Sequence, residues 1–384
     1  MVKDGITKIK RTKSKRLKIL MLVGYSSGPS GVWQRCKDEA IEFSKQGYQV
    51  VIFSSNAVKG KPGEYADEFE ELEGPGYHVN IRRFPYFKLG GESYMLWNFK
   101  KEAIEYNPKL ILTHSYRHTH SDKALKIAKK IGCKVVCVTH APFVHNRSLP
   151  AKMIVAVKDY FSNIDQFDKV IAISKWEVPI LKELGTGLFC SKIKIIPNPI
   201  PDRYYEGPIK QGKGILYLGR YHPIKDLKTL VKGLRASKHY RTATFVGSGE
   251  EPEINDIKFS ERINRVKIKW NEPVYDIEKK IEIIDNHEIF VLPSLREAMP
   301  IALVEAMARG KIVIASKTDG AKELIKHGEN GFLFDVSDYE ELGELLNKIY
   351  KLPENVKKQV RDEARNSMKD RMMSNVMLKW KRVF

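Results

Sequence analysis

The sequence predicts an α/β protein built from two doubly wound domains. Short apolar runs alternate with amphipathic stretches along most of the chain, which is typical of parallel strand-helix-strand units. The chain has 384 residues, more than the roughly 250 at which a single hydrophobic core usually stops growing. The alternation pauses once, in a stretch rich in Pro and Gly over residues 197–214, and then restarts. Two similar folded halves are therefore expected.

The first half opens with a complete unit of this kind. A strand over residues 18–23 is followed by a Gly-rich turn at 28–31, a helix to about Lys45 and a strand over 50–53. Further buried strands are predicted at residues 110–112, 135–138, 170–173 and 193–196, with helical stretches between them. These elements predict one doubly wound sheet over residues 18–205.

The second half repeats the pattern over residues 206–370. Strands are predicted at residues 214–218, 243–246, 289–292 and 312–315, with a helix beginning at Leu227. Met373, Val376, Met377 and Trp380 recur at helical spacing and predict a last helix within residues 371–384 whose apolar face is buried.

Composition limits the kind of protein and its partners. Hydrophobic residues make up 42% and charged residues 30%, as in globular proteins with filled cores. The formal charge of +20 favours anionic partners. Residues 1–17 carry seven Lys and Arg residues against one Asp, and we expect them to form a basic arm. The apolar run Ile19–Val23 is far shorter than the roughly 20 residues that span a bilayer, so a cytoplasmic protein is expected.

Several motifs of other protein classes are absent or incomplete. The four cysteines (Cys36, Cys133, Cys137 and Cys190) lack the spacing of a zinc site and are interpreted as reduced thiols. Gly247 and Gly249 begin a dinucleotide motif, but Pro252 stands where its third glycine belongs, which argues against nicotinamide binding. The sequence also contains no Asp-x-Asp pair for a divalent ion and no metal-ligand spacing among its histidines. His114, His118 and His120 are interpreted as loop or acceptor-side residues.

The most informative segment covers residues 292–310. A strand ends at Pro293, the following loop carries Glu297, and a helix begins near Pro300. The free N–H groups at such a helix start form an anion site above the strand end. Glu305 lies inside this helix. From spacing alone, two solvated carboxylates on a surface helix remain an alternative.

Two other segments place functional side chains after predicted strands. Arg220 and Lys225 follow the strand at 214–218 and are able to converge on a diphosphate, although two ordinary surface cations remain the alternative. Gly31 opens the helix after the first strand, and His140 follows the strand at 135–138. Doubly wound sheets bind ligands at such strand ends.

These motifs together resemble the family 4 retaining glycosyltransferases of glycosyltransferase group 1. Glu297 and Glu305 match that family's Glu, seven residues, Glu pattern within a Pro-Ser-x-x-Glu to Glu-Ala-Met-Ala-x-Gly run. Arg220 and Lys225 match its Gly-Arg-x-x-x-x-Lys-Gly loop, except that Asp226 replaces the last Gly. The resemblance implies a GT-B fold, in which two Rossmann-like domains face each other across a cleft and a last helix crosses back to the first domain.

The resemblance also implies a role for each matching residue. Glu297 approaches the donor sugar, His140 touches the transferred sugar, and Arg220 and Lys225 neutralise the leaving pyrophosphate, so these four are the catalytic candidates. Glu305 holds the ribose hydroxyls. The remaining donor-binding candidates are Gly31 in the N-terminal, acceptor-side domain and Met299, Pro300 and Ile301 in the C-terminal, donor-side domain. Pro300 offers only its carbonyl.

The predicted activity is transfer of a hexose-type sugar from a UDP-sugar or GDP-sugar to an acceptor such as a lipid-linked or membrane glycan. No cofactor and no metal are expected, because Arg220 and Lys225 take the electrostatic role of a metal ion. The basic arm lacks interleaved aromatic residues, so an anionic membrane surface is a better expected partner than nucleic acid, with peripheral attachment at the inner face of the membrane. Two alternatives remain: a DNA-modifying glycosyltransferase, and an inactive GT-B fold that binds anionic surfaces.

Overall fold

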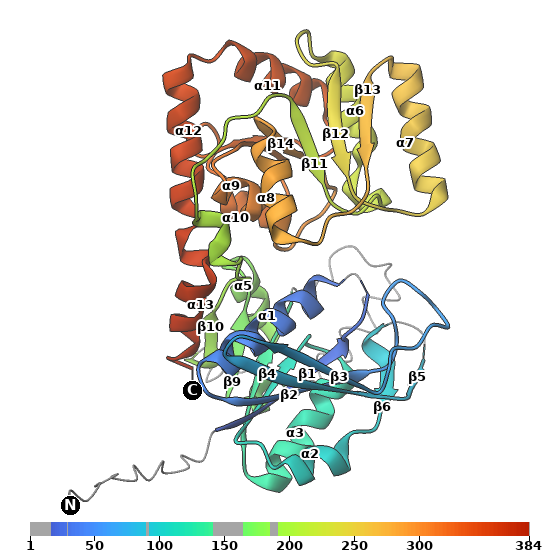
Figure 1. Ribbon diagram of the computed structural model, residues 1–384, viewed down its shortest axis with the longest axis vertical. Helices are drawn as coiled ribbons and strands as arrows, with labels where there is room; N and C mark the ends of the chain where they lie inside the picture. The colour runs from blue at the N-terminus through green and yellow to red at the C-terminus, as the bar shows by residue number, and fades with distance from the viewer. Residues whose placement is uncertain (1–16, 29, 90–91, 141–163, 185–190, 384) are drawn as a thin grey trace, which may run out of the picture. The chain divides into compact units, whose positions relative to one another are not determined.

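The computed structural model describes residues 17–28, 30–89, 92–140, 164–184 and 191–383 (Figure 1). Their contacts group into two compact units. The described residues up to Thr139, together with residues 164–170, form the first unit, and His140 with the described residues from Ile171 onward forms the second. The sequence predicts a domain boundary near residue 205, and this limit stays a prediction. The strands between residues 169 and 195 belong to the first sheet.

The first sheet has eight strands in the order β10-β9-β8-β7-β1-β2-β4-β3. β1 pairs in parallel with both β2 and β7, whereas β3 and β4 at the edge of this sheet pair in antiparallel register. The strand that follows β1 in the chain is added on one side of it, and β7 is added on the other side. This reversal of strand order defines a doubly wound sheet. The strands are β1 (Lys18–Tyr25), β2 (Gln49–Ser55), β3 (Phe69–Gly74), β4 (Tyr77–Phe84), β7 (Leu110–His114), β8 (Lys134–Val138), β9 (Lys169–Ala172) and β10 (Ile193–Ile195).

A small separate hairpin and several helices complete this part of the chain. The hairpin pairs β5 (Tyr86–Lys88) with β6 (Met95–Trp97) in antiparallel register. The helices are α1 (Gly31–Lys45), α2 (Lys100–Tyr106), α3 (Thr119–Ile131) and α5 (Glu177–Leu184). α1 begins where Ser30 Oγ accepts a hydrogen bond from the Trp33 amide, 3.3 Å away, and α3 ends at Gly132 in the left-handed conformation.

The second sheet has six strands in the order β13-β12-β11-β14-β15-β16, and its neighbouring strands all pair in parallel. Its reversal lies between β11 and β14, which pair through Ile215 with Ile289 and Leu216 with Phe290. The strands are β11 (Ile215–Leu218), β12 (Thr242–Val246), β13 (Lys267–Asn271), β14 (Ile289–Leu292), β15 (Ile312–Ser316) and β16 (Phe332–Phe334).

Some helices of the second unit, such as α6, carry their apolar residues on one buried face. In α6, for example, Leu227, Leu230, Val231 and Leu234 are all at most 3% exposed. The helices are α6 (Leu227–Ala236), α7 (Glu251–Asn264), α8 (Ile277–Asp285), α9 (Ile301–Ala308), α10 (Asp319–Leu324), α11 (Tyr339–Lys351), α12 (Glu354–Ser367) and α13 (Met373–Trp380). The predicted apolar stripe of the last helix is buried in α13.

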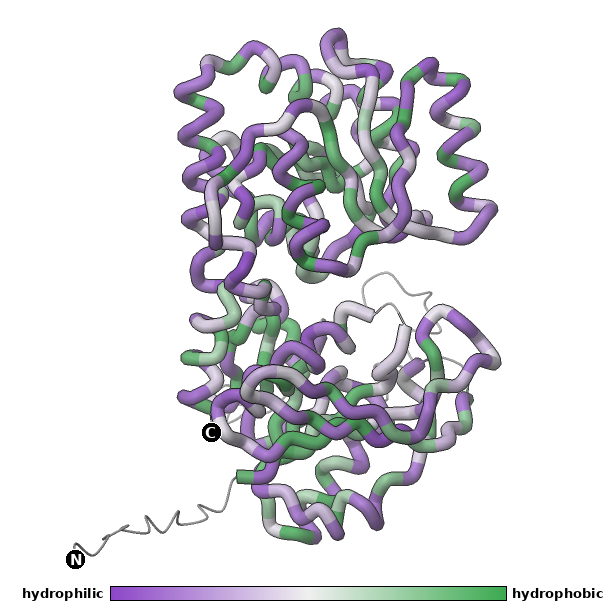
Figure 2. The backbone as a smooth tube through the Cα atoms, viewed as in Figure 1, coloured by the Kyte–Doolittle hydropathy of each residue, from purple (hydrophilic) through white to green (hydrophobic). Residues whose placement is uncertain are grey.

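The sheets hold the apolar residues and the outer helices are largely hydrophilic on their outward sides (Figure 2). β14 and β15 are buried at every position, because parallel strands covered on both faces need continuous apolar sequence. The predicted fold class is confirmed. The pattern missed the edge hairpin β3–β4, since β3 is largely exposed and reads as a polar segment. Within the described part of the chain, no helix combines the length and hydropathy needed to cross a bilayer.

Candidate donor site

The predicted charged residues of the second unit lie at the reversal point of its sheet. Arg220 and Lys225 follow β11, and Glu297 follows β14, its parallel neighbour. The two loops are joined directly, because the Leu295 amide donates a 2.8 Å hydrogen bond to the Ile224 carbonyl. Ligands of doubly wound sheets bind in this position, outside the carboxyl ends of the strands.

Lys225 and Glu297 form an ion pair in this place. Lys225 Nζ lies 2.5 Å from Glu297 Oε1, and the side chains are 20% and 11% exposed. Ser294 Oγ donates to the same carboxylate oxygen at 2.7 Å, and the Ser294 carbonyl accepts from Ser316 Oγ of β15. The Glu297 carboxylate is therefore held by two donors. The two charges that the sequence places 72 residues apart meet at one point.

The Glu305 carboxylate is held by residues that the sequence analysis did not identify. Glu305 is 5% exposed, and its Oε1 accepts from Tyr204 OH at 2.8 Å and from Lys280 Nζ of α8 at 2.9 Å. Tyr204 lies 101 residues earlier in the chain and Lys280 lies 25 residues earlier, so no local motif links them to Glu305. The predicted ribose contact of Glu305 stays a prediction.

The start of α9 supplies free backbone donors. Pro300 occupies the cap position, and the first intrahelical bond runs from the Leu303 amide to the Pro300 carbonyl at 3.1 Å. The amides of Ile301 and Ala302 precede that bond and have no helical acceptor. The Met299 side chain is 7% exposed and its sulfur accepts from Arg371 Nη1 at 3.3 Å. Met299 therefore reaches a ligand only through its backbone.

Arg220 is exposed, and the part of the chain that the structure describes holds no ion pair to it. Its backbone is fixed, since Tyr217 OH donates to the Arg220 carbonyl at 2.7 Å. Burial raises the pKa of the Tyr217 hydroxyl well above its usual value, so it stays a donor. Gly247 closes the floor of this loop: a Cβ there would lie 1.9 Å from the Gly219 carbonyl oxygen.

Asp226, the departure from the family pattern, has a local explanation. Its φ of 45° and ψ of 48° are left-handed, a conformation that Gly adopts freely and that Asp tolerates better than most residues. Its Oδ2 accepts from Thr229 Oγ1 and from Ser337 Oγ, each at 2.8 Å. These two bonds stabilise the turn that Gly forms without side-chain contacts.

Gly31 and His140 also follow strand ends of the first sheet. Gly31 is the first residue of α1 and is exposed. His140 follows β8 with a φ of 52° and is half-buried. Positive φ is uncommon for residues other than glycine, and such strained positions cluster at functional sites. Their contacts with a sugar or a phosphate remain predictions.

Two of the histidines interpreted as loop or acceptor-side residues lie in regular elements of the core, so a loop position is wrong for both. His114 ends β7 fully buried, and His120 lies in α3 at 2% exposure with its Nε2 2.7 Å from the His114 carbonyl. Burial lowers the pKa of His120 to about 4 and that of His114 well below its usual value. Both rings are therefore neutral at ordinary pH.

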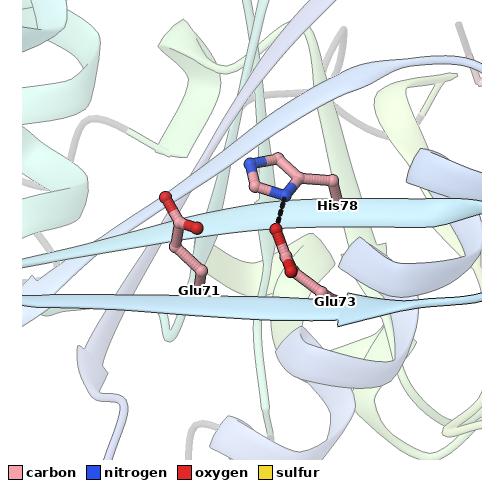
Figure 3. A group of neighbouring side chains, drawn as sticks. All are labelled: Glu71, Glu73 and His78. Carbon is pink, nitrogen blue, oxygen red and sulfur yellow. Dashed lines mark hydrogen bonds and ion pairs between the residues drawn. The ribbon is translucent and has the colours of Figure 1, made fainter.

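Among the described residues, one group has the geometry to hold a metal ion: Glu71, Glu73 and His78 on the β3–β4 hairpin (Figure 3). All three are exposed, and His78 Nδ1 lies 2.8 Å from Glu73 Oε1. The group belongs to the first unit, whereas the ion pair of Lys225 and Glu297 belongs to the second. Solvated acidic pairs on edge hairpins are common, and no further feature here indicates an ion.

Two doubly wound sheets, with a cation and a carboxylate paired at the reversal point of the second, define the class of GT-B transferases. The family comparison agrees with this class. Residues 29–204 match the model of Glycosyltransferase Family 4, and residues 205–367 match that of Glycosyl transferases group 1. The chain belongs to this glycosyltransferase family.

Solved structures share the fold at low sequence identity. HepE from Anabaena, solved in complex with UDP and glucose, superposes with a TM-score of 0.71 at 17% identity, over 96% of this chain and 98% of that one. Sucrose-phosphate synthase from Thermosynechococcus elongatus gives a TM-score of 0.76 at 16% identity over the same shares.

Sequence relatives include enzymes that act on lipid-linked sugars. A UDP-Gal:alpha-D-GlcNAc-diphosphoundecaprenol alpha-1,3-galactosyltransferase from Escherichia coli is 26% identical over 60% of this chain and 65% of its own length. An N,N'-diacetylbacillosaminyl-diphospho-undecaprenol alpha-1,3-N-acetylgalactosaminyltransferase from Campylobacter jejuni is 25% identical over 55% and 49%. The matched segments thus span between about half and two thirds of these relatives.

Proposed function

We propose that this protein is a retaining glycosyltransferase that moves a hexose-type sugar from a UDP-sugar or GDP-sugar to a lipid-linked or membrane glycan, without a metal ion. The observation that carries the proposal is the pairing of Lys225 with Glu297 at the β11–β14 reversal point, with Arg220 on the same loop as Lys225. The names of the two undecaprenol-linked relatives support the acceptor class.

The cations act on the leaving group. As the bond to the anomeric carbon breaks, negative charge grows on the phosphate oxygens of the nucleoside diphosphate. Arg220 and Lys225 meet that charge with fixed positive charge, together with the free amides of Ile301 and Ala302. The residues need little reorganisation, because Leu295 and Ile224 already join the two loops.

The carboxylates act on the sugar and the nucleoside. Binding of a diphosphate draws Lys225 toward the phosphates and leaves Glu297 with its Ser294 hydrogen bond, free to accept from a sugar hydroxyl. Glu305 accepts from the ribose hydroxyls through a carboxylate already oriented by Tyr204 and Lys280. His140, directly after β8, contacts the transferred sugar.

The decisive experiment measures nucleoside diphosphate release and sugar transfer across a panel of UDP- and GDP-sugars, with a detergent-dispersed undecaprenyl-diphosphate-linked sugar as acceptor. One donor should be turned over, equally with and without EDTA, and NMR of the product should show the donor's anomeric configuration. Absence of turnover for every donor contradicts the activity. Loss of turnover in EDTA that Mg²⁺ restores contradicts the metal-independent mechanism.

A further inference from the structure

The β5–β6 hairpin of the first unit exposes an apolar surface. Phe87 and Leu96 lie opposite each other on the two strands and are 62% and 36% exposed. Leu89 and Tyr94, which continue the same hairpin, are 56% and 39% exposed. We call Phe87, Leu89, Tyr94 and Leu96 the hairpin face.

The hairpin face is held in place by the opposite side of the same hairpin. Strand alternation turns Met95 and Trp97 inward, where they are 2% and 3% exposed. The Trp97 ring lies 4.4 Å from that of Phe99, centroid to centroid, and its carbonyl accepts from Lys123 Nζ. The Met95 carbonyl accepts from Thr119 Oγ1. The exposed apolar residues therefore belong to an anchored element, and exposed apolar clusters of this kind mark interaction sites.

The residues around the hairpin face match a lipid headgroup layer. Lys88 is exposed at the edge of the hairpin, on the side of its cross-strand partner Met95. Lys59 pairs with Glu92 at the hairpin and lies 4.8 Å from the Tyr25 ring centroid. Aromatic rings and lysines beside aliphatic side chains are the composition of surfaces that sit at the membrane interface. The net charge of +20 adds a long-range attraction to anionic lipid.

We propose that the hairpin face inserts into the interfacial layer of an anionic bilayer and so brings the acceptor-side domain to acceptors that reside there. The choice of a bilayer over a protein partner rests on the charge of the chain and, through the proposed function, on the undecaprenol-linked acceptors of its relatives. Insertion buries the Phe87, Leu89 and Leu96 side chains and places the Tyr94 hydroxyl among the headgroups.

The test is co-sedimentation of the full chain with phosphatidylglycerol-containing vesicles. The double variant Phe87→Ser with Leu96→Ser should partition at least about tenfold more weakly, because it removes two inserted apolar side chains. Lys88→Glu, which leaves the apolar residues in place, should also weaken binding. The matched control is Phe259→Ser with Ile263→Ser, because these residues are 56% and 59% exposed on α7 of the second unit.

Unchanged partition of the hairpin variant, equal loss in the α7 control, or no vesicle binding by the unaltered protein overturns the proposal. Circular dichroism and the melting temperature check that each variant is folded. Donor hydrolysis separates this proposal from the activity itself. It should be equal in the hairpin variant and the unaltered protein, while transfer to a vesicle-embedded acceptor falls. Vesicle partition remains interpretable even if no donor is hydrolysed, so the two proposals fail independently.

Discussion

At the residue scale, the candidate donor site brings opposite charges together. Lys225 and Glu297 are both largely shielded from solvent and neutralise each other. Removing one residue of such a pair leaves the charge of the other unpaired in a largely buried position, so each substitution affects both binding and stability. Arg220 is exposed and lies outside this pair, so its substitution tests ligand binding without a comparable loss of stability.

We expect Arg220→Ala and Lys225→Ala each to weaken nucleoside diphosphate binding by about ten- to a hundredfold, because each removes a charge-assisted hydrogen bond to phosphate. Titration calorimetry with UDP and GDP measures this. Lys228→Ala is the control, since Lys228 pairs with Asp256 on the surface of the same unit. Unchanged affinity in both loop variants contradicts the diphosphate assignment.

The Glu305 contacts give a second expectation. Lys280→Met and Tyr204→Phe should raise the donor KM and leave kcat nearly unchanged, because each loosens a carboxylate that is proposed to hold the ribose equally in the ground and transition states. Lys280→Arg should recover most of the affinity. Glu297→Gln should instead lower kcat and kcat/KM together. Lys279→Met, an exposed neighbour on α8, should behave like the unaltered protein.

At the element scale, one arginine connects the chain segment that carries Tyr204 to the end of helix α8. Arg309 is 1% exposed; its Nε and Nη2 lie 2.9 and 2.6 Å from the two carboxylate oxygens of Asp285. The same guanidinium donates to the carbonyls of Tyr204, Glu206 and Pro208 at 3.1, 2.9 and 2.9 Å. The segment that carries Tyr204 toward Glu305 is thus fixed by the residue that follows α9.

Arg309→Met should lower the free energy of unfolding by about 3 to 5 kcal/mol, since it removes both hydrogen-bonding donors of the buried Asp285 carboxylate and leaves it only the longer ion pair with Lys311, at 3.8 Å. Urea unfolding followed by circular dichroism measures this. The double variant Arg309→Met with Asp285→Asn should recover part of the loss. A loss in the single variant no larger than that of an exposed substitution such as Lys358→Met contradicts the structural role.

Lys311, next to this pair, makes stability depend on pH. Burial lowers its pKa from 10.5 to about 8, and the positive Arg309 nearby acts in the same direction. Between those two pH values the unfolded chain binds more protons than the folded one at this position, so this group adds stability as pH rises through the window. Relative to the unaltered protein, Lys311→Met should show a flatter melting temperature over this range. An identical pH profile contradicts the shift.

The turn after β11 supplies a prediction about backbone strain. Asp226→Ala should destabilise the protein by roughly 1 to 3 kcal/mol, because Ala is less stable at a φ of 45° and loses both side-chain hydrogen bonds. Asp226→Gly should cost less, since Gly relieves the strain and loses only the bonds to Thr229 and Ser337. A lower melting temperature for Asp226→Gly than for Asp226→Ala contradicts this explanation of Asp226.

At the scale of the whole molecule, two different forces are proposed to act at a membrane. The hairpin face contributes burial of apolar surface, which salt leaves nearly unchanged. The basic arm over residues 1–17, which lies almost entirely outside the described residues, contributes charge, at about 1 kcal/mol for each Lys or Arg near an acidic bilayer. That part fades with salt, because the Debye length falls from ~10 Å at 0.1 M to ~3 Å at 1 M.

Deletion of residues up to Arg16 should therefore remove the salt-sensitive part of vesicle binding and spare transfer to a short-chain acceptor. Co-sedimentation at 0.1 M and 1 M salt, with and without the arm, measures both parts. If the truncated chain keeps all of the salt-sensitive binding, the charges responsible for it lie outside the basic arm. Retardation of duplex DNA by a full-length chain that ignores vesicles favours the DNA-modifying alternative.

The sequence by itself determined the two doubly wound sheets, the β11 and β14 loops and the family. These follow from local information: continuous apolar runs form buried parallel strands, and the Glu297 and Arg220 motifs are contiguous in the chain. Only the tertiary structure decided that Lys225 pairs with Glu297 and that Tyr204 and Lys280 hold Glu305. Such contacts join residues far apart in sequence, and their spacing leaves no periodic signal. The buried His114 and His120 show the same limit, because burial depends on packing around a residue rather than on its neighbours in the chain.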